Sequence, residues 1–162
     1  MIRDATADDF PAILALNAAS VHFLSPLDET RLVRLHAGAA FHRVIETPAG
    51  VQAFLLAFRE TADYDSPNFT WFRERYPAFL YIDRVVVHAG QRGNGLGRLL
   101  YDAIIRFAGD SAAPLLTCEF DIDPPNPGSM RFHAAHGFRE VGTQWLKGGS
   151  KKVSLQARAA AA

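Results

Sequence analysis

The sequence predicts a mixed α/β fold, with one central sheet of six to seven strands and helices flanking it. Three observations carry this prediction. Residues 79–87 form a nearly continuous apolar and β-branched run, which is typical of a strand covered on both faces. Apolar residues then recur at spacings of three and four over residues 96–108, as in an amphipathic helix. Further short apolar runs lie on both sides of this strand–helix pair.

The elements before the central strand begin with a short strand at residues 2–6. Asp8 or Asp9 is placed to cap a helix that has Pro11 in its first turn. An Asp side chain accepts a hydrogen bond from a free N–H group there, and proline has no N–H group to lose. Residues 28–36 predict a second, shorter helix.

A hairpin and a long connection precede the central strand. Residues 41–46 and 51–58 are apolar runs joined by a segment with Pro and Gly, which predicts a hairpin. Residues 61–77 are rich in aromatic residues, Asp and Pro without a clean period, and predict a long loop with one helical turn. Its aromatic residues either shape a substrate site or cover an edge of the core.

The elements after the amphipathic helix complete the sheet. Residues 115–120 predict a strand, and residues 126–136 predict a short helix that ends at Gly137. Residues 138–145 and 152–155 predict the closing strands. Strands and helices thus alternate through the second half of the chain, as expected for a mixed α/β sheet.

One domain is expected over residues 1–158. The chain has 162 residues, with no internal repeat and no low-complexity linker. Its 49% hydrophobic residues suffice for a substantial core. Residues 159–162 read as a loose alanine-rich tail.

Composition excludes several classes of function. The 17 basic and 17 acidic residues cancel, so charge gives no argument for nucleic acid or an anionic membrane as a partner. The single cysteine, Cys118, excludes an intramolecular disulfide and lies in an apolar run, which predicts a buried structural thiol. No apolar stretch reaches the roughly 18 residues of a membrane helix, and the N-terminus lacks a signal-peptide pattern. A cytoplasmic protein is therefore expected.

The turn at residues 92–97 joins the central strand to the amphipathic helix and contains three glycines. Its backbone N–H groups and the first turn of the helix predict an anion site, which the helix dipole strengthens. The alternative is a plain tight connection. Gly97 is followed by Arg98 rather than Lys, which excludes a Walker A loop, and the glycines Gly93 and Gly95 do not fit a dinucleotide fingerprint.

Two segments resemble one known family. Residues 87–98 contain Arg92-x-x-Gly95-x-Gly97, and residues 126–138 contain Asn and Phe followed by Gly-Phe. Together, in this order, they resemble the acetyl-CoA-binding motifs of the GNAT (N-acetyltransferase) superfamily. Ala89 stands where the family often has Pro, and His133 stands where it often has a catalytic tyrosine.

The resemblance implies a mostly antiparallel, GNAT-like sheet and an enzyme that uses acetyl-CoA as co-substrate. Acyl-CoA would lie in a V-shaped opening between the strand that ends at Val87 and the strand from Leu115. The pantetheine would follow the first strand, and the pyrophosphate would lie on the turn. The residues implied to bind it are Val85, Val86, Val87, Arg92, Gly93, Asn94, Gly95, Leu96, Gly97, Arg98, Asn126 and Phe132. Asn126 has the alternative role of helix N-cap before a proline.

Acyl transfer to an amine needs a base, an oxyanion donor and a proton for the thiolate. His133 is the candidate proton donor, because imidazole titrates near neutral pH, and its alternative is a packing histidine. Asp83 breaks the apolar central strand and is the first candidate base. Pairing with Arg84 is not expected from adjacency, since strand neighbours point to opposite faces. Glu119 and Asp121 are the rival bases, and bulk water is the remaining alternative.

The acceptor is expected to be the primary amine of a small molecule. A protein or peptide N-acetyltransferase and a non-catalytic acyl-CoA-binding or sensing module are the alternatives. The histidines show no metal-ligand spacing, so no metal is expected, and His88 and His136 are expected to be surface or turn residues. The resemblance implies a monomer or a homodimer.

Overall fold

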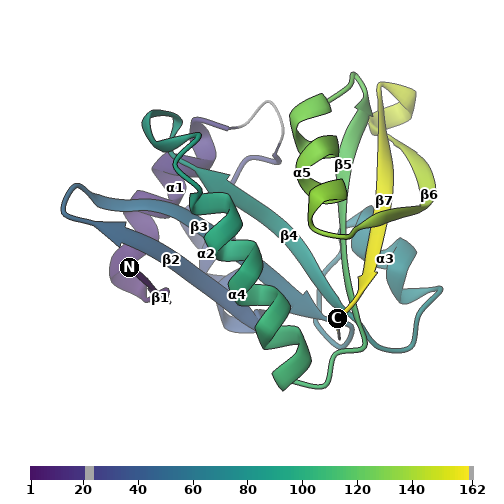
Figure 1. Ribbon diagram of the computed structural model, residues 1–162, viewed down its shortest axis with the longest axis horizontal. Helices are drawn as coiled ribbons and strands as arrows, with labels where there is room; N and C mark the ends of the chain where they lie inside the picture. The colour runs from purple at the N-terminus through teal and green to yellow at the C-terminus, as the bar shows by residue number, and fades with distance from the viewer. Residues whose placement is uncertain (21–23, 161–162) are drawn as a thin grey trace. The chain divides into compact units, whose positions relative to one another are not determined.

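The computed structural model describes residues 1–20 and 24–160 of the chain (Figure 1). Seven strands form one mixed sheet in the order β1-β2-β3-β4-β5-β7-β6, which confirms the predicted fold class. The chain divides into two compact units, Met1–Phe58 with Ile82–Ile104, and Arg59–Tyr81 with Ile105–Ala162. The expectation of one domain over residues 1–158 stays a prediction.

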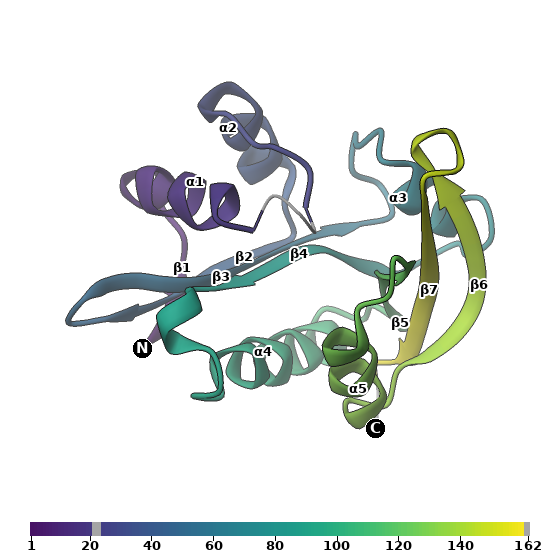
Figure 2. The same ribbon diagram turned by 90° about the horizontal axis from the view of Figure 1, so that it is seen from above.

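The first unit has helices on both faces of its strands. It contains β1 (Ile2–Asp4), β2 (Phe41–Thr47), most of β3 (Gly50–Arg59) and of β4 (Leu80–Val87), α1 (Phe10–Ala18), α2 (Glu29–Gly38) and the first part of α4 (Leu96–Asp110). Helices α1 and α2 cover one face and α4 lies on the other (Figure 2). The strands β1, β2 and β3 pair antiparallel, as the predicted hairpin requires.

The core of the first unit lies between α1, α2 and the sheet. Its buried members include Phe10 and Ile13 of α1, Leu32 of α2, Phe54 of β3 and Val86 of β4. These side chains come from the apolar face of each helix and from alternate strand positions, which is why the periodicity predicted them. The core fixes the end of β4, from which the candidate site starts.

Asp9 stands at the N-terminus of α1, as predicted, but its carboxylate does not cap that helix. It accepts two hydrogen bonds from the Arg3 guanidinium, both 2.8 Å long, and one from the Thr6 N–H group at 2.8 Å. The charged Arg3 partner explains this, since bidentate Arg–carboxylate pairs are stronger than a neutral cap. The hydrogen bond from Arg3 holds the pKa of Asp9 below its ordinary value.

The second unit contains the other half of the sheet. It comprises the last residue of β3, Leu80 and Tyr81 of β4, the last part of α4, β5 (Leu115–Asp123), β6 (Arg139–Leu146), β7 (Lys151–Ala159), α3 (Pro67–Arg73) and α5 (Pro127–Ala135). β4 pairs parallel with β5, and β7 pairs antiparallel with both β5 and β6. Gly137 follows α5 with a φ angle of 81°, the left-handed conformation predicted at the helix end.

Residues 61–77 contain a longer helix than expected. Proline stands in the first turn of α3, and Phe69 and Phe72 of this helix are fully buried. Both rings contact Phe79 and Tyr81, with ring centroids 5.6 to 6.1 Å apart. The aromatic residues of this segment therefore form a core cluster, which local periodicity could not show.

The end of the chain is more ordered than a loose tail at residues 159–162. Ala159 is the last residue of β7, and the Ala160 N–H group donates to the Pro114 carbonyl at 3.1 Å. Ala159 lies opposite Leu115 of β5, so backbone contacts hold both Ala159 and Ala160. Residues 161 and 162 lie outside the described residues. Of the helices in the described part of the chain, none is long and apolar enough to cross a membrane.

Two histidines of the first unit, His36 of α2 and His42 of β2, form a pair. His36 Nδ1 and His42 Nδ1 are 2.8 Å apart, so one ring donates to the other. His42 is 8% exposed, and its Nε2 has no hydrogen-bond partner among the described residues. Burial, followed by the nearby His36, lowers the pKa of His42 to about 4. At pH values between about 4 and 6.5, the folded protein therefore keeps His42 neutral, whereas an unfolded chain would protonate it.

The His42 pKa predicts a loss of stability in acid. His42 titrates at 6.5 when unfolded and at about 4 when folded, so its contribution is complete above pH 6.5 and is lost as the pH falls toward 4. At pH 5 the loss is about 2 kcal/mol of unfolding free energy. Urea unfolding at pH 7.5 and 5.0 measures it, and a His42→Phe variant lacks this component. Equal pH dependence in the two proteins would contradict the account.

Gly142 of β6 lies against Trp71 of α3, and this contact leaves no room for a side chain at residue 142. A Cβ atom at Gly142 would lie 2.4 Å from Trp71 Cζ2. We expect Gly142→Ala to lower the free energy of unfolding by about 1–3 kcal/mol, since the helix must shift. Gly109→Ala is the matched control, because open space surrounds a Cβ there. Equal unfolding midpoints for both variants in urea would show that α3 does not pack on β6.

Candidate active site

The turn between β4 and α4 depends on two glycines. Gly93 and Gly95 have φ angles of +85° and +80°, a left-handed conformation that other residues adopt only with strain. No atom lies within 4 Å of a Cβ built at either position, so conformation rather than crowding requires glycine. Residues 92–95 are exposed. A ligand can therefore approach this backbone closely.

The start of α4 leaves donors for an anion. The first hydrogen bond of the helix runs from the Leu99 N–H group to the Gly95 carbonyl at 3.0 Å. The N–H groups of Leu96, Gly97 and Arg98 therefore precede the hydrogen-bonded ladder of the helix, where the helix dipole is positive. Arg92 adds an exposed guanidinium to the same turn. These groups together suit a phosphate or pyrophosphate.

Side chains within the turn brace it. His88 Nδ1 accepts a hydrogen bond from the Gly90 N–H group at 3.0 Å, so His88 serves the turn, as predicted. Asn94 Nδ2 donates to Gln91 Oε1 at 3.1 Å, and the Asn94 N–H group donates to the Gln91 carbonyl at 3.2 Å. The Asn94 side chain thus braces the turn, and the coenzyme contact expected of Asn94 stays a prediction.

A cavity of about 270 Å³ lies beside this turn in the first unit. Ala12 and Ala15 of α1 and Ala19 just after it form part of its wall, and His88 and Arg92 reach it from the turn. The small alanine side chains leave the space open. An apolar group could enter it next to an anion held by Arg92.

The β4 residues before the turn alternate in burial. Val86 is buried in the core under α1, whereas Val85 and Val87 are partly exposed. Asp83 shares their strand face by the alternation of side chains. The backbone from Val85 to Val87 is thus accessible from the side on which Val85 and Val87 lie.

Asp83 and Arg84 do form an ion pair, contrary to the expectation from strand alternation. Arg84 Nε donates to Asp83 Oδ2 at 2.6 Å, with the two side chains 2% and 6% exposed. The long arginine stem brings Nε back beside the neighbouring carboxylate. Its Nη1 also donates to Asn17 Oδ1 at 3.1 Å and to the Ser25 carbonyl at 3.3 Å. A buried carboxylate in such a pair has less freedom to act as a base.

Glu119 of the second unit accepts a hydrogen bond from a buried tyrosine. The Tyr81 hydroxyl donates a hydrogen bond to Glu119 Oε1. Tyr81 is 1% exposed, and its ring contacts Phe69 and Phe72 of α3 at centroid distances of 5.6 and 5.9 Å. Glu119 is partly exposed. This carboxylate is accessible to solvent and is oriented by a fixed donor, which makes it a candidate general base.

The neighbours of Glu119 on β5 have other roles. Asp121, the second rival base, pairs with Lys151 Nζ of β7 at 3.1 Å, and both side chains are mostly buried. Cys118 is 2% exposed, which confirms the predicted buried thiol. Burial, and then the charge of Glu119, raise the pKa of the Cys118 thiol well above its ordinary value. The thiol is therefore a poor nucleophile.

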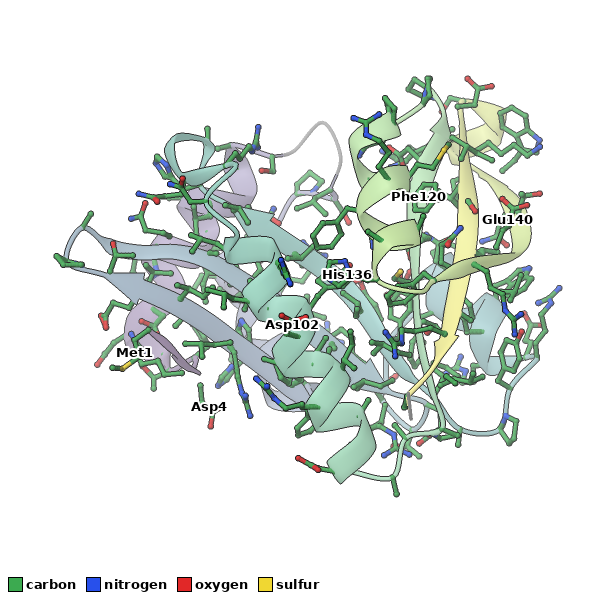
Figure 3. All side chains as sticks on the ribbon, viewed as in Figure 1. Met1, Asp4, Asp102, Phe120, His136 and Glu140 are labelled. Carbon is green, nitrogen blue, oxygen red and sulfur yellow. The ribbon has the colours of Figure 1, made fainter. Side chains whose placement is uncertain are left out.

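His133 is buried in the second unit at 5% exposure. Its ring packs against Phe120 of β5, marked in Figure 3, and against Phe138, at centroid distances of 5.5 and 5.4 Å. Nδ1 lies 2.8 Å from the Ser129 carbonyl oxygen, so Nδ1 carries the proton. Burial lowers the pKa of His133, although the Ser129 carbonyl opposes this. The geometry matches a packing histidine, and the role of proton donor stays a prediction.

Glu119 and His133 lie on opposite faces of β5. Side chains alternate along a strand, so Glu119 faces α3 with Tyr81, whereas Phe120 faces α5 and contacts His133. The structure therefore does not bring the predicted acid and this predicted base together on one face.

Asn126 caps α5, as one of its two expected roles requires. Its side chain accepts a hydrogen bond from the Ser129 N–H group at 3.3 Å. The Phe132 ring packs against the His136 ring with the centroids 4.4 Å apart, and His136 Nδ1 donates to the Phe132 carbonyl at 2.9 Å. These contacts order α5. The coenzyme contacts expected of Asn126 and Phe132 stay predictions.

Tyr81 is the residue that sequence reasoning missed. It stands in the apolar central strand two residues before Asp83, so a polar group in a buried run was the available signal. Groups of three or more His, Cys, Asp or Glu side chains that could hold a metal ion do not occur among the described residues.

Comparison with known proteins places these features in a family. The model of the acetyltransferase (GNAT) family matches residues 57–138. No curated protein sequence matches the chain.

Solved structures share the fold at low sequence identity. Ribosomal-protein-alanine N-acetyltransferase from Brucella melitensis is 24% identical with a TM-score of 0.72, covering 98% of this chain and 99% of its own. The protein yncA from Salmonella typhimurium, solved with its cofactor acetyl-CoA, is 20% identical with a TM-score of 0.75, at 99% and 93% coverage. Naa20 from Chaetomium thermophilum, in complex with a bisubstrate analogue, is 17% identical with a TM-score of 0.78, at 98% and 86% coverage.

The family match covers half of the chain and contains both the glycine turn and the Asn126–Phe138 segment. The seven-stranded mixed sheet agrees with the fold of the solved structures. The chain therefore belongs to the GNAT family of acetyltransferases.

Proposed function

We propose that this acetyltransferase transfers the acetyl group of acetyl-CoA to a primary amine of a small molecule. The observation that carries the proposal is the turn in which Gly93 and Gly95 hold positive φ angles at the start of α4. This turn matches the family motif residue by residue and offers backbone donors where an anion would bind. The family match supplies the reaction class.

The coenzyme would be held mainly by backbone groups. The N–H groups of Leu96, Gly97 and Arg98, with the Arg92 guanidinium, would bind the pyrophosphate. The accessible backbone of residues 85–87 would bind the pantetheine. Asn126 and Phe132 are assigned to the coenzyme by the family motif alone.

Between heavy atoms, the reaction forms one N–C bond and breaks one C–S bond. The amine nitrogen attacks the thioester carbon, the N–C bond forms, and the C–S bond breaks to release the thiolate of CoA. A backbone N–H group of β4 would stabilise the developing oxyanion. The amine loses one proton to the base, and the thiolate gains one from the solvent.

Glu119 is the base that the geometry supports best. Asp83 is engaged by the buried guanidinium of Arg84 at 2.6 Å, and Asp121 is engaged by Lys151 at 3.1 Å. Glu119 combines partial exposure with a donor hydroxyl. His133 would donate a proton in its charged form, which its lowered pKa disfavours.

A peptide N-terminus is the second candidate acceptor. It is favoured by the fold shared with ribosomal-protein-alanine N-acetyltransferase from Brucella melitensis, at a TM-score of 0.72. Thiol release from acetyl-CoA separates the two acceptor classes, using spermidine, an aminoglycoside, free amino acids and short peptides. A chain that binds acetyl-CoA and releases no thiol with any of them would be a binding or sensing module instead.

The glycine turn predicts a specific loss of coenzyme affinity. Gly95→Ala places a side chain at a φ angle of +80°, so the turn should rearrange and acetyl-CoA should bind at least about 10-fold more weakly. Gly50→Ala is the matched control, because Gly50 also has a positive φ angle and open space around it, in the β2–β3 turn. Calorimetric titration measures both. Equal affinities would remove the turn from the coenzyme site.

The base assignment predicts a loss of turnover without a loss of binding. Glu119→Gln keeps the size of the side chain and removes the proton acceptor, so kcat should fall by about 100-fold or more. The KM for acetyl-CoA should change less than about twofold. Initial rates of thiol release with the preferred amine measure both constants. Wild-type kcat in this variant would assign the base elsewhere.

A further inference from the structure

The hydroxyl of Tyr81 is held in place independently of Glu119. Main-chain pairing sets Tyr81 opposite Thr117 of β5, and the Tyr81 ring packs against Phe69 and Phe72 of α3. The ring is 1% exposed, so it has little freedom to move. The position of the hydroxyl oxygen, from which Tyr81 donates to Glu119, is thus fixed by the core.

We propose that Tyr81 is a positioning residue that keeps the Glu119 carboxylate ionised and in one orientation for the acceptor amine. The proposal rests on the proposed function, in which Glu119 is the base. An O–H donor stabilises the charged form of a carboxylate more than the neutral form. A fixed carboxylate also spares the reaction the cost of ordering it. Tyr81 keeps its proton throughout, and the amine proton passes to Glu119.

Two cations on the elements around Glu119, Lys151 and Arg73, have other partners. Asp121, the next residue on the same face of β5, pairs with Lys151 of β7 at 3.1 Å. On α3, the guanidinium of Arg73 lies 5.3 Å from the centre of the Phe69 ring. Lys151 thus pairs with Asp121 and Arg73 lies over the Phe69 ring, whereas the Tyr81 hydroxyl donates directly to the Glu119 carboxylate.

Titration of the carboxylate tests the contact without any acceptor. The side-chain carboxyl carbon of Glu119, labelled with ¹³C and assigned through Glu119→Gln, reports its protonation by NMR. In Tyr81→Phe the ring packing remains and the hydroxyl is lost, so the titration midpoint should rise by about one pH unit. Tyr76→Phe is the matched control, because Tyr76 stacks on Phe72 in the same cluster at 6.4 Å. Unchanged midpoints in Tyr81→Phe would overturn the proposal.

Kinetics test the positioning role. In Tyr81→Phe, kcat at pH 7 should fall about 10-fold, the acid limb of the pH–rate profile should move to higher pH, and the KM for acetyl-CoA should stay within about twofold. A purely structural role would lower the melting temperature and leave the acid limb in place. In the Glu119→Gln background, Tyr81→Phe should add no further loss of kcat.

The outcomes separate this inference from the proposed function. If Glu119→Gln retains full turnover, the base assignment fails, whatever Tyr81→Phe does to the NMR titration. If Glu119→Gln loses turnover but Tyr81→Phe shifts neither the titration midpoint nor the acid limb, the base stands and the role of Tyr81 is refuted. A shift in both supports the proposal.

Discussion

The positive φ angles of Gly93 and Gly95 are the constraint on which the coenzyme site depends. Only glycine adopts them without strain, and they let the chain leave β4 and begin α4 within a few residues. The helix then starts with three N–H groups ahead of its hydrogen-bonded ladder, next to Arg92. The core under α1 fixes β4 through Val86 and so fixes the position of the turn. Anion binding at this place follows from backbone geometry more than from side chains.

The second unit builds its candidate chemistry from buried aromatic packing. The helix α3 exists because Phe69 and Phe72 bury their rings against Phe79 and Tyr81. The same packing holds the Tyr81 hydroxyl in place, and Glu119 accepts a hydrogen bond from this hydroxyl. A segment that is polar and aromatic in sequence thereby becomes the support of a candidate base. The opposite face of β5 carries His133 in an apolar setting, where its pKa is lowered by burial.

Local sequence patterns predicted the strands, the long helices and the glycine turn. Each of these has a signal within one short segment: an apolar run for a buried strand, helical periodicity for a helix, and glycine spacing for the turn. Contacts between residues far apart in the chain could not be predicted from these local patterns. Tyr81 and Glu119 are 38 residues apart, and only the parallel pairing of β4 with β5 brings them together. The Asp83–Arg84 pair was missed because strand alternation describes where a side chain starts and not how far an arginine reaches. α3 was underestimated because its helical period is masked by aromatic residues on several sides.

The most direct test of coenzyme binding at the turn is a ¹⁵N-resolved NMR titration that compares acetyl-CoA with acetyl-pantetheine, which lacks the pyrophosphate. Coenzyme binding at the turn predicts saturable shifts with acetyl-CoA, and little change with acetyl-pantetheine, at the amides of Gly93, Gly95, Leu96, Gly97 and Arg98. Binding of acetyl-CoA that leaves these amides unmoved, or equal shifts with both compounds, would contradict it.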